Sequence, residues 1–92
     1  MDGIERAAQK EVERTGSFIE KVEILKDSEE ARQVLLLARA YYSDSLHFLK
    51  EGKFIEAFEA AIISWGYVDS GLHFGKFRVP DEFLKNFTVE KK

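Results

Sequence analysis

Two aspartate–histidine pairs are the side chains in this sequence whose spacing could bind a metal ion. Asp44 and His47 are three residues apart, and Asp69 and His73 are four apart, so each pair shares one helix face. A closed zinc site needs four ligands. In the helical hairpin described below, His47 would lie ~8 Å and His73 ~30 Å from the turn, so the two pairs cannot combine. We therefore expect no metal site and interpret these residues as solvated or ion-paired.

Asp69 is the most informative polar residue, because the pattern places it among bulky apolar side chains. It lies between Trp65 and Leu72 on one stripe, where an unpartnered carboxylate would be strongly destabilising. The antiparallel hairpin brings Arg32 or Arg39 within its reach. The favoured interpretation is a buried acid that fixes helix register through an arginine or a tyrosine hydroxyl. A ligand-binding aspartate is the first alternative. A catalytic carboxylate is the last, because no second acid lies beside Asp69 on the same face.

Aromatic residues gather near the middle of the same hairpin, namely Tyr41, Tyr42, Trp65 and Tyr67. Aromatic residues at helical spacing are typical of a core. The alternative is a pocket in which Tyr41, Tyr42 and Trp65 stack on a base or another ring and Asp69 binds its polar groups. The chain would then be a small-ligand or nucleotide-binding accessory of an enzyme system. No serine has a histidine and an acid at its level, and no glycine-rich phosphate loop is present, so we expect no catalytic residue and no cofactor.

Three helical segments must position these side chains. Apolar residues recur every three or four positions, which predicts helices over residues 3–26, 28–51 and 54–74. The sequence Thr15-Gly16-Ser17 could interrupt the first segment, but the apolar stripe keeps its phase across it, so one continuous helix is favoured. Asp27 and Glu30 have the spacing of a capping box at the start of the second helix.

The connection between the second and third helices is a turn around Gly52, which we expect in the left-handed conformation. So short a connection makes the two helices antiparallel. The first helix then covers a remaining apolar side, which gives an all-α, up-down-up three-helix bundle in one domain, 1–92. Residues 76–92 form an apolar C-terminal tail that docks on the bundle, with one helical turn starting near Pro80.

Several apolar residues lie off the main helical stripes: Phe18, Leu36, Leu37, Ile63, Tyr67 and Phe74. Three helices cannot cover all of them, so either the tail or a second copy of the chain must do so. This surplus predicts a non-enzymatic protein-interaction or self-association module. Its partner is expected to be a second copy in a homodimer, or another protein. The predicted interaction surface consists of Leu36, Leu37, Ile63, Tyr67 and Phe74.

Composition excludes several classes of protein. The formal net charge is −3, with no cluster of Lys or Arg, so a nucleic-acid partner is not expected. The absence of cysteine excludes disulfides and thiolate chemistry. No apolar run approaches the ~20 residues of a membrane span and no signal peptide is visible, so we expect a cytoplasmic protein without a membrane partner. Twelve Glu and nine Lys against one Asn and two Gln fit a heat-adapted proteome.

The hairpin carries a resemblance to a known family. Residues 41–58 hold a helix that ends in a Glu51-Gly52-Lys53-Phe54 turn, and residues 65–71 read Trp-Gly-Tyr-Val-Asp-Ser-Gly. Together they resemble a small archaeal family of uncharacterised proteins, the domain of unknown function family 357. The resemblance extends from about Phe18 onward. It implies an archaeal origin and a compact helical bundle, and it implies no activity.

Overall fold

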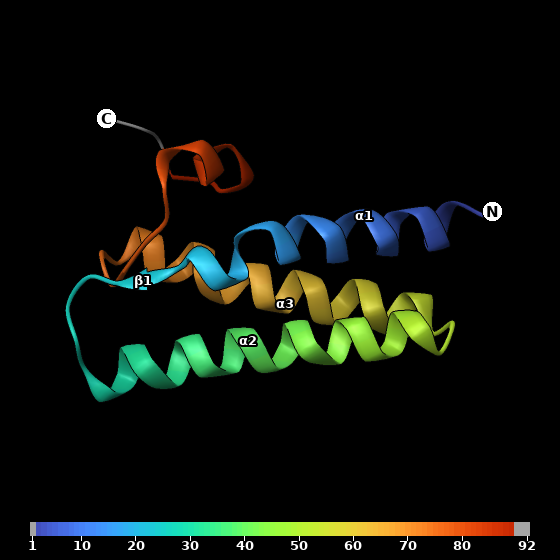
Figure 1. The fold of residues 1–92 in the computed structure, drawn as a ribbon, viewed down its shortest axis with the longest axis horizontal. Helices are drawn as coiled ribbons and strands as arrows, with labels where there is room; N and C mark the ends of the chain where they lie inside the picture. Colours follow the sequence, from blue (N-terminus) through green and yellow to red (C-terminus); the bar gives the residue numbers. More distant parts are fainter. Residues whose placement is uncertain (1, 90–92) are drawn as a thin grey trace.

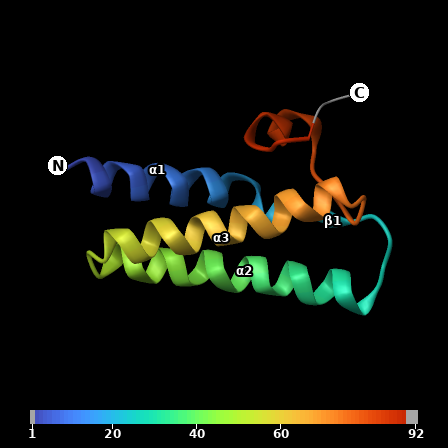
Figure 2. The ribbon, with the colours of Figure 1, turned by 180° about the vertical axis from the view of Figure 1, so that it is seen from behind.

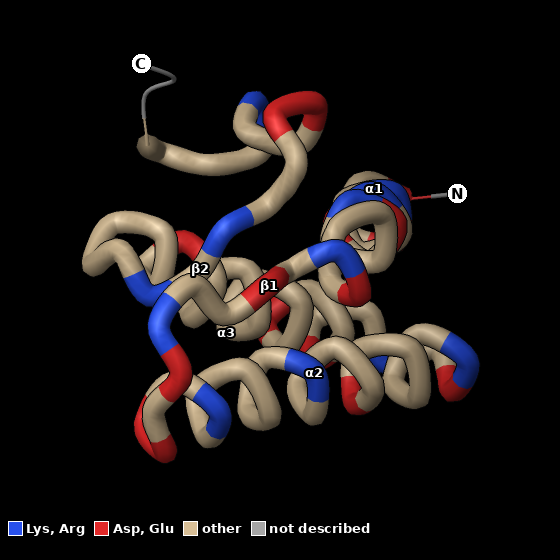
Figure 3. Tube along the Cα trace, turned by 60° about the vertical axis from the view of Figure 1, so that its left-hand side comes forward, with Lys and Arg blue, Asp and Glu red and all other residues tan. Residues whose placement is uncertain are grey.

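The computed structural model describes residues 2–89, most of which lie in three long helices (Figure 1). These helices are α1 (Gly3–Phe18), α2 (Glu29–Lys50) and α3 (Phe54–His73). α1 and α3 run in the same direction and α2 runs in the opposite one, and α3 lies between the other two (Figures 1 and 3). The predicted all-α, up-down-up bundle is confirmed.

Glycines end both helices of the α2–α3 hairpin. Gly52 has a φ of 77° and Gly75, just after α3, has a φ of 69°. Residues other than glycine rarely adopt this left-handed region. The backbone N–H of Lys53 donates to the carbonyl of Phe48 at 2.9 Å and closes the turn. The predicted left-handed glycine at position 52 is confirmed.

The start of α2 differs by one residue from the predicted cap. Ser28, and not Asp27, is the N-cap, and its hydroxyl accepts a hydrogen bond from the backbone N–H of Ala31 at 3.1 Å. Asp27 instead forms an ion pair with Arg32 at 2.6 Å. A serine hydroxyl satisfies a free N–H of the first turn as well as an aspartate does, so the sequence offered two equivalent caps.

The first predicted helix is too long, and this part of the prediction is wrong. α1 continues through Gly16 as expected but ends at Phe18, followed by the 3₁₀ helix η1 (Ile19–Lys21) and the short strand β1 (Glu23–Ile24). β1 pairs antiparallel with β2 (Phe77–Arg78), so that Glu23 faces Arg78. The physical reason is the pairing itself, because residues more than fifty positions away compete with the helix for the same backbone groups.

Small residues on α3 allow its neighbours to approach closely. They occupy one face of the helix and are buried: Ala57, Ala61, Ser64, Val68 and Gly71. The hydroxyl of Ser64 donates to the carbonyl of Ala38 at 2.6 Å, which ties a side chain of α3 to the backbone of α2. The large side chains of α3 therefore lie on either side of this small-residue face. We refer to these two sides as the flanks of α3.

The tail packs into the core at Gly71 of α3. Phe77 of β2 is almost fully buried and lies against Gly71 so closely that a Cβ there would overlap the phenyl ring. Beyond β2, the tail forms a second 3₁₀ helix, η2 (Asp81–Asn86), where one helical turn was predicted. From behind, α1 and this part of the tail lie along the same edge of α3 (Figure 2).

Two glycines on α3 provide a matched test of this packing. Gly71→Ala should lower the free energy of unfolding by about 1–3 kcal/mol, because the added methyl overpacks the site of Phe77. Gly66→Ala should raise it by about 0.5–1 kcal/mol, since nothing lies within 4 Å of a Cβ built at Gly66. Urea denaturation measures both. Equal effects of the two substitutions would contradict the proposed contact.

Candidate functional site

The tail covers one flank of α3 and is held there by Trp65. The indole Nε1–H donates to the carbonyl of Asn86 at 2.6 Å, and the indole lies parallel to the Phe87 ring with centroids 6.4 Å apart. Phe87 also meets Phe18 of α1 edge-on, at a centroid distance of 4.6 Å. The tail therefore packs on the groove between α1 and α3.

Asp69, one turn after Trp65, binds the tail at Thr88. Its carboxylate accepts hydrogen bonds from the backbone N–H of Thr88 at 2.8 Å and from the Thr88 hydroxyl at 2.7 Å. The Asp69 side chain is 14% exposed, and His73 lies 3.7 Å from it. Asp69 is half-buried and binds the tail through Thr88, whereas the favoured prediction was a buried acid that fixes helix register through an arginine or a tyrosine hydroxyl.

The expected arginine partner of Asp69 is wrong. Arg32 forms an ion pair with Asp27, and Arg39 lies 4.0 Å from the carboxylate of Glu20. Both arginines lie on the other helix of the hairpin, whereas Asp69 lies on the flank of α3 that the tail covers. The sequence pattern placed Asp69 beside Trp65 correctly but could not show that residue 88 returns to meet it.

The opposite flank of α3 is uncovered. At 100° per residue, Tyr67 lies about 160° around the helix from Asp69, so the tail cannot reach both. Ile63 is 42% exposed and Phe74 is 78% exposed, and Tyr67 between them is half-buried. As far as Val89, the last residue described, the tail therefore does not cover the predicted interaction surface of α3.

α2 extends this uncovered flank. Val34, Leu37 and Tyr41 follow one another at spacings of three and four on the same face of the helix, and Leu37 is 43% exposed. The Tyr41 and Tyr67 rings meet across the hairpin at a centroid distance of 6.0 Å. We refer to this surface as the open face, composed of Val34, Leu37, Tyr41, Ile63, Tyr67 and Phe74.

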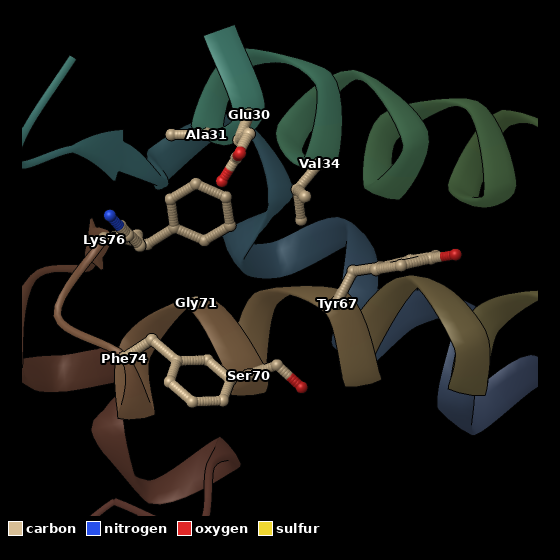
Figure 4. Close-up of a pocket in the computed structure, with 9 residues that line it drawn as sticks. Glu30, Ala31, Val34, Tyr67, Ser70, Gly71, Phe74 and Lys76 are labelled. Atoms are coloured by element: carbon tan, nitrogen blue, oxygen red, sulfur yellow. The ribbon is translucent and has the colours of Figure 1, made fainter. Parts of the chain in front are cut away.

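Two pockets hollow the open face, one on each side of the tyrosine pair. The larger has a volume of about 420 Å³, and Figure 4 shows its walls on α2 and α3. Its lining includes Val34, Tyr67, Ser70, Gly71, Phe74 and Phe77. The smaller pocket has a volume of about 210 Å³ and lies toward the Gly52 turn, between Tyr41, Phe48, Ala60 and Ile63. Pockets of this size in an apolar surface accept large apolar side chains.

The charged residues that border these pockets are mostly acidic. Glu30 and Lys76 border the larger pocket. Asp44, Glu56 and Glu59 border the smaller one. The two pockets together therefore carry four carboxylates and one ammonium group, a formal charge of −3.

Several residues of this surface were not singled out from the sequence. The predicted interaction surface did not include Val34, Glu30, Asp44 or Phe48. The available signal was the spacing of residues 30, 34, 37, 41, 44 and 48, which form one continuous stripe of α2. Leu36, by contrast, is 69% exposed but lines neither of the two pockets.

The predicted ring-binding residues lie in three different places. Tyr41 is on the open face, and the Tyr42 hydroxyl lies against Gly16 of α1, in the space that a side chain there would fill. Trp65 and Asp69 are engaged with the tail. A ring ligand bound between Trp65 and Asp69 would have to displace the tail.

The aspartate–histidine pairs are also separated. His47 forms an ion pair with Glu51 at 3.1 Å if protonated, and the His73 ring lies 2.5 Å from the Thr88 hydroxyl. Among residues 2–89, no group of three or more His, Cys, Asp or Glu side chains is arranged to hold a metal ion. No helix in the same range is long and apolar enough to cross a membrane.

The fold and the two flanks of α3 define a small all-α bundle protein with a docked tail. A family model described as protein of unknown function, DUF357, matches residues 5–77. The chain belongs to this family, which confirms the resemblance seen in residues 41–58 and 65–71. The open face lies within the matched range, and Asn86, Phe87 and Thr88 lie beyond it.

A solved relative shows the same arrangement of helices. The crystal structure of protein AF1782 from Archaeoglobus fulgidus, which carries the DUF357 family model, superposes with a TM-score of 0.70. The two chains are 28% identical, and the match covers 84% of this chain and 93% of the other. No curated protein matches the sequence.

The anchoring of the tail by Asp69 can be tested with the single tryptophan of the chain. Asp69→Ala should shift the Trp65 emission to the red, because loss of the Thr88 hydrogen bonds releases Phe87 from the indole, and should reduce stability by about 1–2 kcal/mol. Asp69→Asn, which keeps an acceptor for the Thr88 N–H, should shift the emission less.

Truncation after Val79 removes Phe87 and Thr88 and should therefore give the largest red shift of the Trp65 emission. Glu59→Ala, on another side of α3, is the control and should leave the emission unchanged. An Asp69→Ala emission spectrum identical to that of the unmodified protein would contradict the anchor.

Proposed function

We propose that the chain is a non-enzymatic protein-interaction module whose open face binds a helix of another protein. The observation that carries this proposal is the exposure of a continuous apolar surface across both helices of the hairpin, while the tail is engaged on the opposite flank. Contiguous apolar surfaces of this kind are typical of partner-binding sites.

The shape of the open face favours a helix as the bound element. The two pockets follow one another between the antiparallel helices α2 and α3, over about 27 Å from Glu30 to Phe48 at 1.5 Å per residue. We refer to the two pockets and the tyrosine pair between them as the groove. On the other side of the hairpin, α1 packs against these helices through Ala8 and Val12. A helix in the groove of the open face would complete a four-helix arrangement.

The tyrosine pair supports the same proposal. Tyr41 and Tyr67 lie between the two pockets, half-buried, with their rings already in contact. Tyrosine is enriched among residues that dominate binding energy, because a large area is held with few rotatable bonds. A partner helix would place apolar side chains in the pockets on either side of this pair.

The proposal is tested by comparing what the protein retains from a lysate of its source organism before and after charge is placed on the open face. Ile63→Glu and Tyr67→Glu should each remove the specifically retained partner, since a hot-spot loss of about 2 kcal/mol weakens binding about thirtyfold. Leu25→Glu is the matched control, because Leu25 is 57% exposed and lies outside the open face. Retention that is the same for all three variants would contradict the proposal.

Light scattering on the purified chain decides whether a second copy is the partner. We expect the mass of a single chain. A dimer that dissociates on Tyr67→Glu would assign the open face to self-association, as expected from the sequence, and would replace the heterologous partner.

A further inference from the structure

We infer that the partner helix is amphipathic and basic, with lysine or arginine residues on both sides of its apolar stripe. This inference rests on the proposed function and identifies the chemistry of its partner. The juxtaposition that carries it is an apolar groove bordered by carboxylates from both of its helices: Glu30 and Asp44 on α2, and Glu56 and Glu59 on α3.

The charge of the open face is unusual for this molecule. The residues bordering the two pockets carry a formal charge of −3, and the whole chain also carries −3. The remainder of the protein is therefore balanced, and its acidic excess is concentrated around the groove. Because charge complementarity selects partners and accelerates their association, the groove favours a cationic ligand.

The same charge argues against two other occupants. A second copy of the chain would bring an identical acidic border against this one, and only Lys76 of each copy could offset it. An anionic membrane surface attracts basic faces and repels acidic ones. A basic amphipathic helix combines the apolar and the charged requirements, and binding of such a helix in an apolar groove is an established recognition mode.

The distribution of the acids also orients the partner. Three of the four carboxylates lie at the end near the Gly52 turn, and Lys76 lies at the other end beside Glu30. Asp44 is about 21 Å along α2 from Glu30. A helix in the groove would therefore place a bulky apolar residue in the larger pocket and its basic residues mainly about 14 positions away.

Three synthetic peptides test the inference. Each is a helix of about 18 residues, the length of the groove. The first has leucine on one stripe and lysine on both borders, the second has glutamine in place of every lysine, and the third has the composition of the first in a scrambled order. Fluorescence anisotropy of labelled peptides with the full chain measures binding at low and high salt.

The lysine peptide should bind about tenfold more tightly than the glutamine peptide at low salt, and this advantage should shrink as salt screens the charges. The triple variant Asp44→Asn, Glu56→Gln, Glu59→Gln should lose this advantage and bind the glutamine peptide unchanged. A control variant of equal charge, Glu5→Gln, Glu13→Gln, Glu82→Gln, should keep it.

Equal affinity for the lysine and glutamine peptides would overturn the inference and leave the proposed docking function standing. Binding of the lysine peptide that survives Tyr67→Glu, or equal binding of the scrambled peptide, would show attraction without docking and would overturn the inference. If no peptide binds while lysate retention still depends on Tyr67, the basic amphipathic partner is wrong and the docking function stands. If no peptide binds and lysate retention does not depend on Tyr67, both the inference and the proposed docking function are overturned.

Discussion

The close approach of backbones along the small-residue face of α3 is the constraint on which the rest of the structure depends. Ala61, Ser64 and Gly71 leave no room between α3 and its neighbours for larger side chains. The hydrogen bond from Ser64 to the carbonyl of Ala38 fixes α3 against α2 at this distance. Interiors packed to this density accept no added methyl group without strain, so bulky residues of α3 must lie on its flanks.

The two flanks are then completed in different ways. On one, Trp65 and Asp69 bind the tail through hydrogen bonds and ring contacts. On the other, Ile63 and Phe74 are exposed, Tyr67 is half-buried against Tyr41 of α2, and carboxylates of both helices border this surface. The first flank is stabilised from within the chain, and the described residues leave the second exposed.

The sequence predicted those parts of the fold that depend on local pattern. The bounds of α2 and α3, the turn at Gly52 and the exposure of Leu37, Ile63 and Phe74 follow from periodicity and turn chemistry. What it missed depends on contacts between distant residues. The end of α1 is set by the pairing of β1 with β2, and the partner of Asp69 is Thr88. No local pattern shows which distant segment a residue will meet.

The same limit applies to the candidate site. The sequence grouped the aromatic side chains Tyr41, Tyr42 and Trp65, but the structure separates them. Tyr41 meets Tyr67 of α3, Tyr42 lies against α1, and Trp65 packs against the tail. The sequence showed the open face in part, as a surplus of apolar residues. Its acidic border could be recognised only once the rotation of α2 and α3 about their axes was known. Helical phase gives the stripe on each helix, and only packing places the two stripes side by side.

The most direct test of the account is to map the bound lysine peptide on the protein by NMR. Chemical-shift changes should be confined to the open face, with large effects at Leu37, Tyr41, Ile63 and Tyr67. The Trp65 indole resonance should remain unchanged, because the tail stays in place on the other flank. Changes centred on Trp65 and Thr88, with the tyrosine pair unaffected, would contradict the account.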